Sequence, residues 1–167
     1  GLLDVQQISI PQSVTFLGDD IFTACLSLQS ITLPDQVSTI PSGCFTSCIA
    51  LKNIDLPTSL LEISKSAFSS CTSLETVVIP NNVTKIGEKA FDGCKNLLSV
   101  TLPKQLETLG DRVFNDCYRL AEVVNLSNAD LNSSNVQSYA VRIATSGTSQ
   151  IRTVGDFKFV TGNDGTD

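Results

Sequence analysis

The chain has 167 residues, of which 41% are apolar and 17% are charged, and its net charge is −6. This composition is too apolar for a disordered segment, and no stretch reaches the roughly 18 consecutive apolar residues of a membrane-spanning helix. The acidic balance disfavours nucleic acid as a partner, because phosphate backbones would be repelled. The absence of His excludes Ser-His-Asp and Cys-His catalysis and His-ligated metal sites. We therefore expect no nucleic acid, no membrane insertion, no metal and no cofactor.

Four residue types recur along the chain with one period of 23 residues. Self-similarity at such a period is typical of a solenoid, propeller or repeat array. The four series are Pro11, Pro34, Pro57, Pro80 and Pro103; Phe22, Phe45, Phe68, Phe91 and Phe114; Cys25, Cys48, Cys71, Cys94 and Cys117; and Leu28, Leu51, Leu74, Leu97 and Leu120. One repeat unit cannot bury its apolar face alone, so we expect the units to stack with like residues above like.

The repeats divide residues 1–126 into units. Residues 1–7 end a truncated unit, with Leu2 and Val5 at the Cys and Leu positions. Full units start at Ile8, Ile31, Ile54, Val77 and Val100. A partial unit starts at Val123 and loses the pattern at Asn125 and Leu126.

Within a unit, apolar and polar residues first alternate and a Pro then follows, which predicts a short strand. The Val-x-x-Ile segment predicts a second extended stretch. The Ala-Phe-x-x-Cys segment is too short for a stable α-helix, so we expect a helical turn or 3₁₀ piece there. The apolar positions predict a buried core, which in the first unit comprises Ile8, Ile10, Val14, Leu17, Ile21, Phe22, Cys25 and Leu28.

The repeated cysteines lie three residues after the core Phe and three before the core Leu, on the inward side. Residues one repeat apart point the same way, and parallel Cβ vectors suit a disulfide badly. We therefore expect free, buried thiols that act as small apolar residues. Cys44 stands at the Ala position of other units, and without His it is a weak metal signal.

Residues 127–167 depart from the repeat. Asn125 to Gln137 is polar and loop-like, and the residues around Tyr139 to Ala144 alternate as in a half-buried strand. Ser146-Gly147-Thr148 is a turn signal, and Ile151 to Val160 predicts a second strand interrupted at Gly155-Asp156. We interpret this region as a β-hairpin-like cap over the open end of the solenoid.

The repeat pattern resembles the BspA-like type of leucine-rich repeat. Leu74 to Pro80 and Ile86 to Cys94 carry its motif nearly letter for letter, and the resemblance covers Leu2 to about Leu126. It implies a right-handed α/β (β-rich) solenoid with short parallel strands. It also implies an extracellular or cell-surface protein, often an adhesin or surface antigen, without catalytic residues. We expect the chain to be a piece of a longer protein.

The outward positions of the predicted sheet are small, polar and almost uncharged. An ordered surface of short side chains costs little side-chain entropy when a partner docks on it. The predicted ligand-binding residues are Ser30, Thr32, Asn53, Asp55, Thr76, Val78, Ser99 and Thr101. A further candidate surface comprises the apolar residues expected at outward positions, namely Phe16, Leu26, Ile49, Leu61 and Leu98.

The functional hypothesis is a non-catalytic recognition module, a monomer that binds an extracellular protein or glycan through the sheet face. The alternative is a structural spacer in a larger surface protein, with no ligand of its own. Carboxylate pairs such as Glu107 with Asp111 fall at outward positions, where solvated surface charge is the simpler interpretation. A ligand site should differ between units, as Asp55 and Val78 do, whereas a spacer should show uniform hydroxyls.

Overall fold

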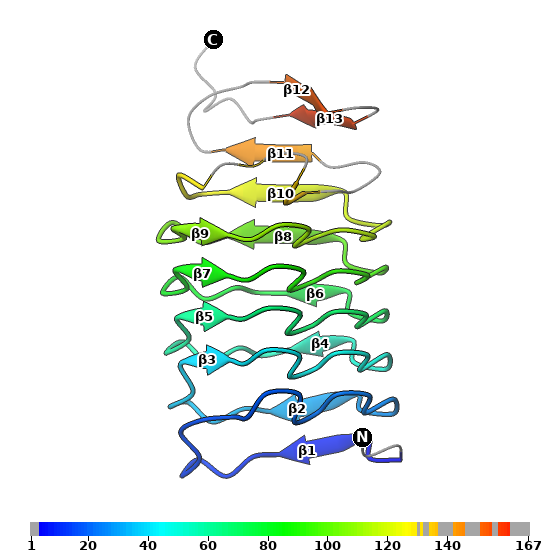
Figure 1. Cartoon of the computed structure of the whole chain (residues 1–167), viewed down its shortest axis with the longest axis vertical. Coiled ribbons are helices and arrows are strands. Elements are labelled where there is room, and N and C mark those ends of the chain that lie inside the picture. The colour runs from blue at the N-terminus through cyan, green and yellow to red at the C-terminus, as the bar shows by residue number, and fades with distance from the viewer. Residues whose placement is uncertain are drawn as a thin grey trace.

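The computed structural model shows a parallel β-solenoid of about five turns (Figure 1). It describes residues 4–129, 131, 134–136, 142–145, 151–154 and 157–160. Each 23-residue unit forms one turn of the solenoid and contains one short strand before its Pro, and the units from Ile31 onward add a second short strand to a second sheet, which confirms the predicted repeat architecture. Leu2 and the turn signals at residues 146–148 and 155–156 lie outside the described residues.

The first sheet contains the strand that precedes each Pro. Its strands are β1 (Gln7–Ser9), β2 (Ser30–Thr32), β4 (Asn53–Ile54), β6 (Thr76–Val77), β8 (Ser99–Leu102) and β10 (Glu122–Asn125). β1 pairs with β2, and the later strands form one ladder, each parallel to the next with like repeat positions opposite each other. The middle residue of the motif points inward, as in β2, where Ile31 is buried between exposed Ser30 and Thr32.

The second sheet contains the predicted Val-x-x-Ile stretch. Its strands are β3 (Thr39–Ile40), β5 (Glu62–Ile63), β7 (Lys85–Ile86) and β9 (Thr108–Leu109), again parallel and in register. Ile40, Ile63 and Ile86 are fully buried. Ion pairs on the exposed face join neighbouring units, since Lys85 Nζ lies 3.0 Å from Glu62 and Lys65 Nζ lies 2.9 Å from Glu88. Such exposed pairs each add little stability. Both pairs join positions one repeat apart, as the strand pairing does.

The core is a column of like residues stacked along the solenoid. The phenylalanine rings of successive units lie 5.2 to 5.8 Å apart between centroids, with interplanar angles of 6 to 14°. Phe45, Phe68, Phe91 and Phe114 are fully buried, and so are the repeated cysteines from Cys48 to Cys117. Burial of these columns in every unit makes the units depend on their immediate neighbours for a shared core.

The segment around the core Phe is not helical, which corrects the expectation of a helical turn there. The residues that the structure describes contain no helix, and this segment is a series of hydrogen-bonded turns. In the second unit Cys44 and Thr46 donate N–H bonds within the unit, whereas Phe45 N–H donates to the carbonyl of Ala67 in the next unit. In a helix, successive backbone N–H groups donate to carbonyls of the same segment. The alternation between bonds within the unit and bonds to the next unit therefore excludes a helix here.

Backbone torsions exclude a helix for a second reason. Residues two before and two after the core Phe have positive φ, as at Ser66 (55°) and Ser70 (61°) around Phe68. Right-handed helices require negative φ throughout. The turns instead form a third ladder of hydrogen bonds between units, which we call the turn ladder (the N–H groups of residues 20, 22 and 24 and of their repeat equivalents).

The first full unit is less enclosed than the units that follow it. Ile21 was expected in the core, but it is 53% exposed, whereas its equivalents Cys44, Ala67 and Ala90 are fully buried. Each of these equivalents has a complete described unit on both sides. Ile21 has such a unit on one side, so part of its side chain faces solvent.

The polar segment that follows β10 packs against the last full unit. Asn125 takes a core position and remains 5% exposed; its side-chain amide donates to Ala129 and accepts from Ser127. The carbonyls of Ser134 and Asn135 accept N–H bonds from Arg112 and Phe114, so these two residues continue the turn ladder where a repeat unit would otherwise stand. Val136 beside them is buried.

The hairpin lies later in the chain than the sequence predicts. β11 (Arg142–Thr145) pairs parallel to β10 and extends the first sheet by one strand. The antiparallel pair is β12 (Ile151–Val154) with β13 (Phe157–Val160), both within the stretch expected to form a single strand. β13 lies beside β11 at the end of the stack (Figure 1). The boundary at residue 126 stays a prediction.

Candidate functional site

The eight predicted ligand-binding residues all lie on the first sheet or directly beside it, and all are exposed. They form two rows that run along the solenoid, because residues one repeat apart lie side by side. The first row is Ser30, Asn53, Thr76 and Ser99, and the second is Thr32, Asp55, Val78 and Thr101. The structure therefore brings them together on one face.

In the middle of the first sheet, the second-row residues Asp55 and Val78 lie beyond the paired part of their strands. β4 and β6 pair only over Asn53–Ile54 and Thr76–Val77, whereas β8 and β10 pair over four residues. The strand pairing therefore ends just before Asp55 and Val78. Between the two chain segments that continue from there, the surface has a depression of about 610 Å³.

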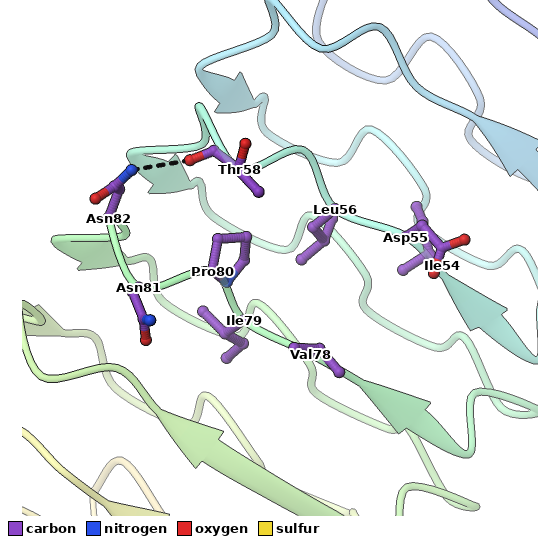
Figure 2. A pocket seen from close by; sticks show the side chains of 9 residues that line it. All are labelled: Ile54, Asp55, Leu56, Thr58, Val78, Ile79, Pro80, Asn81 and Asn82. Carbon is purple, nitrogen blue, oxygen red and sulfur yellow. Dashed lines mark hydrogen bonds between the residues drawn. The ribbon is translucent and has the colours of Figure 1, made fainter.

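This depression has an apolar middle and polar ends. Figure 2 shows Leu56, Ile79 and Pro80 between Asp55 on one side and Asn81 and Asn82 on the other. Val78 is 80% exposed at the same site, so its isopropyl group is open to contact. Such a surface offers apolar contact together with carboxylate, amide and hydroxyl groups.

A second depression of about 300 Å³ lies on the other side of Asp55. The two share Asp55, Leu56 and Thr58, so together they form one shallow groove that touches the first four units. We call it the strand-end groove, and it comprises residues 31–35, 54–58 and 78–82 together with Gln12.

Hydrogen bonds between units hold the rim of the groove. Asn82 Nδ2 donates to the Thr58 carbonyl at 2.9 Å, which ties the third unit to the fourth (Figure 2). Gln12 Oε1 accepts the backbone N–H of Asp35 at 3.0 Å, which ties the first unit to the second. A rim fixed in advance loses less entropy when a ligand binds.

Asp55 is the one carboxylate among the four predicted residues of the second row. It makes no hydrogen bond or ion pair with any residue that the structure describes, whereas Asp19, Asp92 and Glu88 each have a partner. The groove lining contains Asp35 and Asp55 and no Lys or Arg. The negative charge of Asp55 is therefore available to a ligand.

The cysteine column has a polar role that the sequence did not predict. Each thiol from Cys48 to Cys117 donates to the carbonyl of the core Phe in the unit before, as Cys71 Sγ does to Phe45 at 3.1 Å. Burial raises the pKa of the Cys48 and Cys117 thiols to about 12, and raises those of Cys71 and Cys94 well above the usual 9.0. Protonated, enclosed thiols are poor nucleophiles and poor metal ligands.

Other candidate chemistry finds little support among the residues that the structure describes. They contain no group of three Cys, Asp or Glu side chains that could hold a metal ion, and no helix long and apolar enough to cross a membrane. The outward apolar residues Phe16, Leu26, Ile49, Leu61 and Leu98 are exposed, as the sequence predicts.

The groove itself was missed by sequence reasoning. Leu56, Thr58, Asn81 and Asn82 follow the strands and were not among the predicted residues. The available signal was weak: an Asn-Asn pair directly after Pro80, opposite Thr58 in the preceding unit.

Comparisons with known proteins agree with this architecture. Residues 2–121 match the model of the BspA type leucine rich repeat region, in six copies. No curated protein matches the chain.

Solved structures with the same fold come from several bacteria. The leucine rich repeat protein TpLRR of T. pallidum is 26% identical with a TM-score of 0.70, over 83% of this chain and 72% of that one. A leucine-rich repeat protein from Bacteroides ovatus is 26% identical with a TM-score of 0.62, over 85% of this chain and 45% of that one. A leucine rich cell surface protein from Faecalibacterium prausnitzii is 27% identical with a TM-score of 0.67, over 85% of this chain and 40% of that one.

The chain thus spans less than half of the last two of these relatives. The family model covers most of the chain, and its six copies agree with the stacked units described above. The chain therefore belongs to the BspA-type leucine-rich repeat family.

Proposed function

We propose that the chain is a cell-surface or secreted recognition module that binds an extracellular protein or glycan through the exposed face of the first sheet. The observation that carries this proposal is the strand-end groove, where the second row changes from the hydroxyl of Thr32 to Asp55 beside Val78 and back to a hydroxyl at Thr101. A uniform spacer would need no such change between neighbouring units. The similarity to a leucine rich cell surface protein supports the location.

Binding is favoured over catalysis by the chemistry of the same face. Among the residues that line the groove, no hydroxyl group is hydrogen-bonded to a carboxylate, and the buried thiols of the core are held protonated. The repeat family and the solenoid fold are typically non-catalytic. A groove of hydroxyls, amides and the carboxylates of Asp35 and Asp55 is suited to reversible docking.

An array of extracellular matrix proteins and glycans tests the proposal. The native chain is compared with a variant that carries Thr32→Arg, Asp55→Arg and Thr76→Arg on the first sheet. The matched control carries Ser38→Arg, Glu107→Arg and Thr108→Arg at exposed positions on or beside the second sheet, with the same total change in charge. We expect a ligand that the native chain and the control bind and that the first-sheet variant loses.

The other outcomes are equally informative. A ligand that both variants retain would move the site away from the two sheets, to the turns or the end of the stack. The spacer alternative predicts that no ligand on the array is bound by any of the three proteins, and that result would contradict the proposal.

A further inference from the structure

The strand-end groove has the length of a short extended peptide. It touches four units, and three strand spacings of about 4.8 Å give about 14 Å, which an extended chain covers with about four residues. Its direction is along the solenoid, across the strand ends rather than along one strand. The occupant that fits this shape is a narrow linear segment.

The charge of the groove selects the kind of segment. Asp35 and Asp55 line it, no cationic side chain does, and the whole chain carries a net charge of −6. Lys52 directly precedes β4 and Asp55 directly follows it, so the ammonium group of Lys52 belongs to the end of the strand away from the groove. A positively charged group therefore gains from entering the groove, and a negatively charged one is repelled.

The apolar part of the groove lies directly beside Asp55. Val78 is 80% exposed, and Leu56, Ile79 and Pro80 form the middle of the depression (Figure 2). An aliphatic side chain next to the cation in the bound segment would cover these groups. Burial of apolar surface would then supply the larger share of the affinity, because an exposed ion pair alone contributes little.

We propose that the strand-end groove binds an extended peptide segment of a protein partner, with a Lys or Arg side chain against Asp55 and an aliphatic side chain on Val78 and Leu56. This inference rests on the proposed function and narrows it from a protein or glycan to a basic linear segment. It also assigns different tasks to two adjacent residues, since Asp55 selects for charge and Val78 selects for apolar contact.

Labelled octapeptides with blocked ends test the inference. One central position varies among Arg, Lys, Gln and Glu, and the next varies among Val, Leu and Ser. We expect the native chain to bind the Arg-Val and Lys-Leu types best, and to bind them more weakly as salt is added, because exposed ion pairs are screened. Fluorescence anisotropy gives the affinities.

Two isosteric variants separate the tasks of the two residues. Asp55→Asn should lower the preference for Arg over Gln by up to about fivefold, the scale of one exposed ion pair, and leave the preference for Val over Ser. Val78→Thr should do the reverse. Glu107→Gln on the other sheet removes one carboxylate elsewhere and should change neither preference.

Several outcomes would overturn the inference. Binding of no peptide by the native chain, equal binding of Arg and Glu peptides, or an unchanged Arg preference in Asp55→Asn would each do so. A glycan that the native chain binds and Asp55→Asn loses would also overturn it, while the proposed recognition function would stand. Failure of every ligand, peptide or glycan, would end both.

Discussion

The interior columns and the strand-end groove follow opposite rules. Inside the solenoid, one residue type is repeated unit after unit, so that Phe stacks on Phe at 5.2 to 5.8 Å and each buried thiol from Cys48 to Cys117 reaches the Phe carbonyl of the unit before. On the groove, neighbouring units differ, and Asp55 stands beside Val78. Repetition thus specifies the fold, whereas departure from it makes the surface of one unit chemically different from that of the next.

The largest expected effect comes from cutting the Phe column at its centre. Phe68 is fully buried, with a stacked ring at 5.2 Å on each side, so Phe68→Ala should cost about 3–5 kcal/mol of the free energy of unfolding. Val78→Ala, on the groove, should cost less than about 0.5 kcal/mol. Urea denaturation measures both, and similar losses at the two positions would refute the contrast. Phe68→Leu extends the test if the Ala variant does not fold.

The next effect concerns how closely the backbones of two units approach. A Cβ added at Gly87 would lie 2.6 Å from Lys65 N and 2.7 Å from the Ser64 carbonyl carbon, whereas one at Gly18 meets nothing within 4 Å. We expect Gly87→Ala to destabilise by about 1–3 kcal/mol and Gly18→Ala to change stability by less than about 1 kcal/mol. Thermal unfolding of the two variants compares them, and equal midpoints would mean that the units can move apart at no cost.

Alkaline pH tests the thiol column. Burial holds the pKa of Cys48 at about 12 in the folded chain, above its usual 9.0. The folded state therefore retains a proton that the unfolded state releases, so stability is complete below pH 9 and falls as pH rises from 9 toward 12, by about 1.4 kcal/mol per pH unit for each such thiol. Cys48→Ala should make the fall with pH shallower. An unchanged slope would show that this thiol is not enclosed.

The smallest expected effect is on the groove face. Thr32→Arg, Asp55→Arg and Thr76→Arg replace exposed side chains, and Asp55 has no partner among the described residues. Each should change the free energy of unfolding by no more than about 0.5 kcal/mol. Denaturation of the triple variant measures the sum. A loss comparable to that of Phe68→Ala would mean that this face contributes to the fold, and the binding results from it would lose their meaning.

The sequence predicted those features that depend on the period alone. The spacing of Pro, Phe, Cys and Leu predicted the units, the two extended stretches and the inward and outward faces, because like residues in register must share one environment. It did not predict the turns around Phe68, since their conformation depends on N–H bonds to the next unit. A short Ala-Phe-x-x-Cys segment carries no local sign of those partners.

The groove and the end of the stack escaped prediction for related reasons. The segments Ile54 to Pro57, Val77 to Pro80 and Val100 to Pro103 share one pattern, yet only the last lies in a strand that pairs over four residues with its neighbour. Nothing local shows where pairing stops. Likewise Ser134 and Asn135 replace a repeat unit through their backbone carbonyls, and such a role leaves no side-chain signature.

The three ladders of backbone hydrogen bonds have a mechanical consequence. In the part of the chain that the structure describes, all three join one unit to the next and so run along the stack, although the first is interrupted between β2 and β4. A force that pulls the two ends apart along this axis loads the bonds of every interface in the direction in which they stretch. Because contacts are confined to neighbouring units, we expect the solenoid to yield by releasing units one after another, as a series of small steps rather than a single rupture.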